Sequence, residues 1–402
     1  MKKNFAYTAC VKTMSVLAVS IGLAACGNGS WWSKDDEPTL NAEQIRKALP
    51  GRVNDRTSWA QDIYDITDQL GIPQTKENVC SIVAVVDQES NFVADPQVAG
   101  LGEKAVKEVQ TRLDEKFKEK LGDGIGGTVA GYFEEVLKTQ PSPKDNYLSQ
   151  MRRVKTEREL DELYREIFDY MSKHYHVSAL TGAAKLVGQD FGEKMNPITT
   201  LGSMQVHIGY AKEHKRQGGN IAELRTDLYS QYGGLYYGIH RLMMYPADYD
   251  KPLYRFADYN SGMYSSRNAA FQSMLNDLTA AELTLDGDLL LYSKDGSPRS
   301  AKSESERELT NVFAANNVIL TPRQIRADLK NEKEQDFEDT ATYRAVTKLY
   351  KEKTGKEPFY AMMPQVVISG PKLSRDYNTN WFASRVNGRY QTCMNKIKHL
   401  KI

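Results

Sequence analysis

The chain has 402 residues, and its 53 Lys or Arg residues balance 52 Asp or Glu residues, giving a formal net charge of +1. Without residues 1–25, which hold three Lys and no acidic residue, 50 basic residues face 52 acidic ones, about −2. This balance lacks the basic excess of proteins that bind nucleic acid or an anionic membrane, so it argues against both classes. The length suffices for one large hydrophobic core or two modest ones.

Residues 1–25 have the pattern of a secretory signal peptide. Lysines precede a short run of apolar and small residues that is too short to span a membrane. The run closes on Leu-Ala-Ala-Cys, which resembles a bacterial lipobox. The resemblance implies cleavage before Cys26 and diacylglycerol attachment to its sulfur. The alternative is ordinary signal cleavage with Cys26 incidental.

Residues 26–38 are expected to form the lipidated cysteine and a tether, and residues 39–402 a single domain. Residue 27 is Gly rather than Asp, which by resemblance to enteric lipoproteins favours a lipid anchor in the outer membrane, facing the periplasm. Several acyl chains anchor a protein stably, and the sequence shows no transmembrane candidate.

Two helices are expected at the start of the folded part. The first covers residues 39–49, with Asn41 as its N-cap and Pro50 as its stop. The second covers residues 58–70, which place apolar side chains on one face before the breaker sequence of residues 71–73.

The next helix, capped near residues 74–75, ends in a carboxylate. Apolar residues recur at helical spacing and predict a buried face: Val79, Ile82, Val83 and Val86. Glu89 follows on or beside this face, at the C-terminal end of the helix. Desolvation and the helix dipole both disfavour its anion there, so we expect a raised pKa, as a general acid needs. A surface Glu in a last helical turn is the alternative.

Two cysteines remain after the signal peptide and the acylated position are set aside. Cys80 and Cys393 can form one intramolecular bridge in an oxidising periplasm, which would join the C-terminal segment to the Glu89 helix. Two buried free thiols are the alternative.

Residues 97 to about 195 are expected to form a helical insertion or lid. Two charged, amphipathic helical patterns lie on either side of a Gly-rich stretch at residues 122–127, which we expect to be a flexible break. This stretch follows no strand and carries no closing Lys, so it does not predict a phosphate loop.

Strand signals are few, so the fold class is expected to be mainly α with at most a small β element. The best strand candidate is residues 364–370, with residues 289–292 as a possible partner. Residues 378–394 are expected to be helical. Arg385 and Arg389 share one face of this helix, which is expected to be a solvated basic surface, and an acidic partner in the core is the alternative.

Three short blocks occur in order: Glu89-Ser90 at a helix end, Gly202-Ser203-Met204-Gln205-Val206, and Tyr259-Asn260-Ser261-Gly262. Together they resemble lytic transglycosylases of the goose-type lysozyme fold, which have Glu-Ser, Gly-Leu-Met-Gln and Ala-Tyr-Asn-Ala-Gly blocks in that order. The resemblance covers about residues 58–96 and 197–275. The insertion and the C-terminal extension from about residue 285 lie outside it and resemble an uncharacterised family of bacterial lipoproteins.

The resemblance implies a lysozyme-like helical domain and a role for each block. Glu89 would be the catalytic acid and base, and Tyr259 would hydrogen-bond it. The residues expected to bind or orient substrate are Ser90, Met204, Gln205, Tyr259 and Asn260. Two departures stand out: Ser203 replaces an apolar residue, and Asp258, expected at an exposed position, replaces a small one.

The reaction that the resemblance implies needs one carboxyl group. Glu89 would protonate the oxygen joining N-acetylmuramic acid to N-acetylglucosamine in peptidoglycan glycan strands. It would then act as base while the muramic C6 hydroxyl closes on C1, giving 1,6-anhydro ends.

Two alternatives remain. A muramidase that uses water needs a second carboxylate, for which Asp87, Asp95 and Asp190 are candidates. A peptidoglycan-binding scaffold lipoprotein needs no catalysis. No cofactor is expected, and the histidines lack a metal-binding motif, so no metal is expected either. Protein partners are left open.

Overall fold

The computed structural model describes residues 38–174, 192–193, 195–279, 281–293, 296–368 and 377–401. Over these residues the protein is mainly helical, with two short two-stranded sheets, as the sequence predicts. The predicted signal peptide, Cys26, and the tether up to residue 37 lie outside the described residues. None of the helices in the described ranges combines the length and apolar character that crossing a membrane requires.

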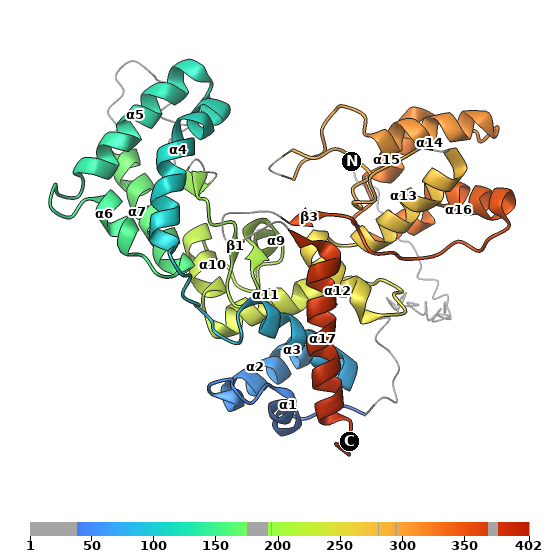
Figure 1. Ribbon diagram of the computed structural model, residues 1–402, viewed down its shortest axis with the longest axis horizontal. Coiled ribbons are helices and arrows are strands. Elements are labelled where there is room, and N and C mark those ends of the chain that lie inside the picture. Colours follow the sequence, from blue (N-terminus) through green and yellow to red (C-terminus); the bar gives the residue numbers. More distant parts are fainter. Residues whose placement is uncertain are drawn as a thin grey trace, which may run out of the picture.

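A base of six helices carries two lobes, which rise on either side of it in Figure 1. The base helices are α1 (Ala42–Ala48), α2 (Arg56–Gln69), α3 (Lys76–Glu89), α11 (Gln231–Met243), α12 (Pro252–Ser261) and α17 (Thr379–Ile397). Their starts follow from local chemistry, because the Asn41 and Thr75 side chains accept hydrogen bonds from the exposed N–H groups of α1 and α3. α17 packs along α3 and α12, so the end of the chain completes the base.

The insertion forms the first lobe, built from α4 (Leu101–Leu121), α5 (Asp123–Thr139), α6 (Tyr147–Arg153) and α7 (Glu157–His174). The expected flexible break at residues 122–127 was wrong, because α5 begins directly after Gly122. Gly126 lies so close to α4 that a Cβ there would come within 2.5 Å of the Lys118 Cα. The glycines therefore permit close helix packing.

A buried ion pair fixes the insertion to α10 (Ile221–Leu228), which packs against α11 of the base. The guanidinium of Arg225, on α10, donates to Asp161 of α7 at 2.7 Å and to Glu193 at 2.6 Å. Arg225 and Asp161 are both fully buried. Because an unpaired buried charge is costly, this pair holds the lobe in one orientation.

The second lobe has its own hydrophobic cluster and consists of α13 (Ser265–Thr279), α14 (Glu304–Ala315), α15 (Pro322–Leu329), the 3₁₀ helix η1 (Gln335–Asp339) and α16 (Ala341–Thr354). β3 (Val367–Ile368) pairs with β4 (Tyr377–Asn378), so the expected partner at residues 289–292 was wrong. Leu289 and Leu290 are both buried in this lobe, which is incompatible with the alternation of a half-buried strand.

A disulfide joins the two ends of the base. Cys80 of α3 and Cys393 of α17 are bonded with their Cα atoms 5.5 Å apart, across a separation of 313 residues. The C-terminal extension predicted from about residue 285 is therefore two parts: a separate lobe, and a helix integral to the core of the base.

Candidate functional site

The first block of the site is the end of α3. The apolar face of α3 is buried along its length, and Glu89 is its last residue and half-buried. Asn91 and Phe92 follow shortly after the end of α3. Both have left-handed backbone, with φ of 52° and 61°, which is uncommon for residues other than glycine, and together they turn the chain sharply. Phe92 is buried edge-on against Trp59, with ring centroids 5.2 Å apart, which holds this turn in place. Such conformations cost on the order of 1–3 kcal/mol each and tend to occur at functional sites.

The second block is the loop between β1 (Thr200–Leu201) and β2 (Val206–His207), and it lies directly against α11. Gly202 has a φ of 76°, and Gln205 also has left-handed backbone. A Cβ on Gly238 of α11 would come within 2.2 Å of the Met204 sulfur. Because Gly238 has no side chain, the loop can pack directly against α11, and Met204 is fully buried there.

The third block meets the second through Tyr259 of α12. Its hydroxyl donates to the carbonyl oxygen of Met204 at 2.7 Å, so the expectation that this proton goes to Glu89 was wrong. A buried main-chain carbonyl needs a donor, and Tyr259 supplies it. Burial raises the pKa of Tyr259 well above its usual range, the Arg241 charge opposes the rise, and the Glu89 charge adds to it. Glu89, Met204 and Tyr259 therefore form one neighbourhood.

The remaining predicted residues hold the site together. Ser90 is buried, and its hydroxyl donates to the Val86 carbonyl at 3.3 Å, so it caps α3. The Gln205 amide nitrogen donates to the Glu157 carboxylate at 3.1 Å, and its oxygen accepts from Thr200 at 3.1 Å. Gln205 thus connects the loop to the first turn of α7 in the insertion.

Several polar atoms at this site are buried without a hydrogen-bond partner among the described residues. They are the Gln88 Oε1, Ser203 Oγ, Arg241 Nε and Asn260 Oδ1 atoms. Buried polar groups in folded proteins are generally paired, so each exception needs an explanation. Four of the six exceptions among the described residues lie on or next to the three blocks and on the helix between them, and the other two, Asp161 Oδ2 and Arg165 Nε, face each other as an ion pair in the insertion. Unpaired atoms grouped in this way are typical of a site that a polar ligand completes.

Arg241 is a residue of this site that the sequence analysis missed. Its guanidinium donates to the Tyr259 carbonyl at 2.8 Å and lies 5.1 Å from the centre of the Tyr259 ring. It belongs to α11, the helix between the second and third blocks, whose buried residues are glycines or apolar and aromatic side chains. A lone Arg within that apolar pattern was the available signal.

Asp258 does not have the exposed position expected for it. It is 1% exposed and accepts hydrogen bonds from the hydroxyl groups of Tyr249 at 2.6 Å and Ser265 at 3.0 Å, and from the Ser266 N–H at 2.7 Å. Burial raises the pKa of Asp258, and the hydrogen bonds oppose the rise. Its role is to join α12 to α13, just beside Tyr259.

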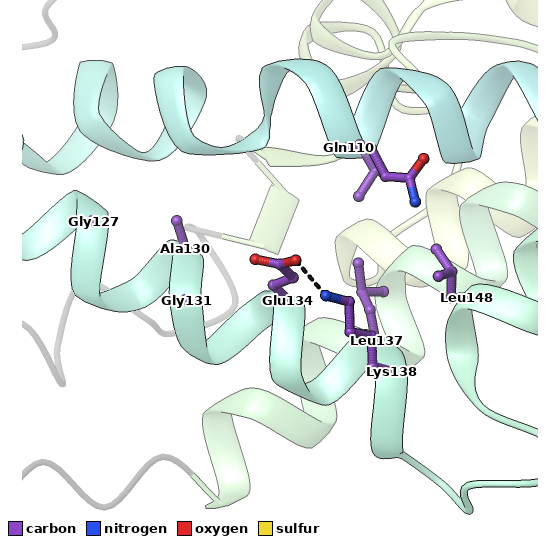
Figure 2. A pocket seen from close by; sticks show the side chains of 9 residues that line it. Gln110, Gly127, Ala130, Gly131, Glu134, Leu137, Lys138 and Leu148 are labelled. Atoms are coloured by element: carbon purple, nitrogen blue, oxygen red, sulfur yellow. Dashed lines mark hydrogen bonds and ion pairs between the residues drawn. The ribbon is translucent and has the colours of Figure 1, made fainter.

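A separate cavity of about 480 Å³ lies within the insertion. Figure 2 shows Gln110 of α4, Leu137 of α5 and Leu148 of α6 around it, with the Glu134–Lys138 ion pair at 2.5 Å nearby. Its walls combine aliphatic and small residues with Gln110 and the paired Glu134 and Lys138 side chains. No group of three or more His, Cys, Asp or Glu side chains in the described ranges could hold a metal ion.

Comparison with known proteins identifies the family. A family model described as "Protein of unknown function (DUF1615)" matches residues 52–396, and the chain belongs to this family. The chain is 32% identical over 391 residues to "Uncharacterized protein YaiW" of Escherichia coli (strain K12), covering 96% of this chain and 98% of that relative. No solved structure matches. The family match runs through all three blocks and both lobes, so the lobes belong to the family's common body.

Proposed function

We propose that the protein is a lytic transglycosylase, which cleaves the linkage between N-acetylmuramic acid and N-acetylglucosamine in peptidoglycan. The observation that carries this proposal is the convergence of three blocks far apart in the sequence. Glu89, the Met204 carbonyl and Tyr259 lie in one neighbourhood, beside buried polar atoms that lack partners among the described residues. A glycan rich in hydroxyl and acetamido groups would supply those partners.

In the proposed reaction Glu89 transfers its proton to the glycosidic oxygen as the bond from that oxygen to the muramic C1 breaks. The C6 hydroxyl oxygen then bonds to C1, and its proton returns to Glu89. The products are a 1,6-anhydromuramic end and a free N-acetylglucosamine 4-hydroxyl, with no water consumed. Because the nucleophile belongs to the substrate, high effective molarity replaces a second protein carboxylate.

The surrounding residues would position this chemistry rather than perform it. Asn260 offers the substrate an amide oxygen with no partner among the described residues, and Arg241 offers an N–H. Met204 has no exposed side-chain surface, so its contribution is the carbonyl that fixes Tyr259 beside Glu89. Glu89 is half-buried, so water has only partial access to the proposed acid.

We also propose that Cys26 carries the lipid anchor and that the domain faces the periplasm from the outer membrane. The disulfide between Cys80 and Cys393 supports an oxidising compartment, because such bonds are rare in reducing ones.

Mass spectrometry of digested sacculi tests the reaction. Wild type is expected to release anhydromuropeptides, and Glu89→Gln is expected to release none. Muropeptides with reducing ends would instead indicate a muramidase that uses water.

A scaffold that binds glycan without cleaving it is the second candidate. One observation favours it: the amide nitrogen of Gln205 is already engaged by Glu157. Retention of the protein on sacculi, with no muropeptide released by either wild type or Glu89→Gln, would support this candidate against the enzyme.

A further inference from the structure

A cavity of about 490 Å³ lies in the base between α1, α3 and α17. This volume is within the range of small-ligand sites, roughly 300–1,000 Å³. Its lining includes four cationic side chains and a single carboxylate: Arg52, Arg385, Arg389, Lys396 and Asp87. We call this cavity the basic pocket.

Asp87 positions two of the four cations. Its carboxylate accepts one hydrogen bond from Arg52 and another from the Arg389 Nε at 3.1 Å, and its side chain is 7% exposed. The solvated basic face expected for Arg385 and Arg389 was therefore wrong for Arg389, which pairs with the core. Because each guanidinium has five N–H donors, both arginines keep donors beyond those that Asp87 uses.

The other two cations have no carboxylate partner among the described residues. Arg385 lies 5.1 Å from the centre of the Trp381 ring, and Lys396 donates to the Leu49 carbonyl. Burial, and next the charge of Arg56, lower the pKa of Lys396, so positive charges crowd one another here. A pocket with this excess favours an anion, and guanidinium groups match the geometry of phosphate.

The place of the basic pocket in the chain indicates where the phosphate comes from. Ala48 and Pro50 line it from α1 and its end, so the pocket adjoins the first helix after the tether. Residues 26–38 can span at most about 45 Å, which keeps this part of the base near the anchored end. The exposed Lys398 and Lys401 follow α17, and the Lys401 carbonyl accepts a hydrogen bond from Gln44 of α1.

We propose that the basic pocket binds the phosphate group of an anionic phospholipid headgroup. This inference rests on the proposed lipid anchor and is independent of the proposed reaction. The near-neutral composition of the whole chain argues against a basic excess over its entire surface, but composition averages over both lobes, whereas these cations gather in one pocket. Binding would hold the base against the membrane and set the direction in which the two lobes face.

Flotation with lipid vesicles tests the proposal. The full mature chain carrying Cys26→Ser is used, so that no acyl chain contributes to binding. It is expected to float with vesicles of phosphatidylglycerol in phosphatidylcholine, more weakly at high salt, and not with phosphatidylcholine alone. Arg385→Gln combined with Lys396→Gln should weaken binding roughly twentyfold or more, because each cation near an anionic surface contributes about a fivefold factor.

Two exposed lysines of α16 provide the matched control. Lys348→Gln with Lys353→Gln removes the same charge from the second lobe and should leave flotation unchanged. Equal loss in both double variants would overturn the proposal, because binding would then follow net charge. Binding of inorganic phosphate without vesicle binding would also overturn it, in favour of a soluble phosphate ligand. No binding of either probe would overturn it outright.

Discussion

The second lobe and the Glu89 site bury polar side chains in opposite ways. In the lobe, the fully buried Arg267 donates to the Glu332 carbonyl at 2.6 Å, the Glu334 carbonyl at 2.9 Å and the Glu338 carboxylate at 3.2 Å. At the Glu89 site, Asn260 and Arg241 keep buried atoms that bond to nothing in the described part of the chain. Paired burial stabilises a fold, whereas unpaired burial lowers stability and is maintained where a ligand supplies the missing partner.

Two asparagines provide the sharpest test of this contrast. Asn268 donates to the Gly287 and Glu332 carbonyls and accepts from Arg267, so Asn268→Leu should cost roughly 3 kcal/mol of unfolding free energy. Asn260→Leu removes an unpartnered oxygen and should change stability by less than about 1 kcal/mol while reducing muropeptide release. Urea denaturation measures both variants. Equal destabilisation would end the contrast between the two regions.

The glycines of α11 test whether the loop must approach this closely. Gly238→Ala places a Cβ within 2.4 Å of the Met204 Cβ, so we expect a loss of about 1–3 kcal/mol and lower activity through displacement of the Met204 carbonyl. Gly131 of α5 is the matched control, because a Cβ there meets nothing within 4 Å. Gly131→Ala should be neutral or stabilising by about 1 kcal/mol. Thermal unfolding and sacculus digestion of both variants give the result.

The paired network of the second lobe predicts a pH dependence. Burial raises the pKa of Glu332 to about 8, although Tyr292 and the Leu289 N–H donate to it. The folded state therefore binds the proton more tightly than the unfolded state. This contribution to stability is fully present below about pH 4.5 and is lost as the pH rises toward 8, by at most about 1.4 kcal/mol per unit.

Unfolding free energies measured from pH 5 to pH 8 check this prediction. Glu332→Gln should flatten the decline, and Glu304→Gln, at an exposed position of α14, should leave it as in wild type. A decline that persists in Glu332→Gln would assign it to other groups.

Local patterns in the sequence predicted those features that depend on neighbours along the chain. The caps at Asn41 and Thr75, the buried face of α3 and the position of Glu89 at its end follow from helical spacing and capping chemistry. The pairing of Cys80 with Cys393 followed from the expectations that only these two cysteines stay free after signal cleavage and acylation, and that the compartment is oxidising.

Contacts between distant segments could not be predicted in this way. Nothing in the neighbourhood of Glu157 indicates that it reaches Gln205, 48 residues away, or that Asp161 meets Arg225. Asp258 was expected at the surface because acidic residues are seldom buried, and only the folded arrangement supplies the tyrosine and serine donors that bury it. The Tyr259 hydroxyl donates to the main-chain carbonyl of Met204 because Met204 is fully buried and its carbonyl needs a donor from the protein.

The most direct test of the central claim is the initial rate of sacculus solubilisation by Glu89→Gln compared with Glu77→Gln. The two changes are identical, and Glu77 is exposed in the first turn of the same helix. We expect Glu89→Gln to lose at least about a hundredfold in rate, as removal of a general acid does, and Glu77→Gln to keep the wild-type rate. Equal rates in the two variants would contradict the assignment of Glu89 as the catalytic acid.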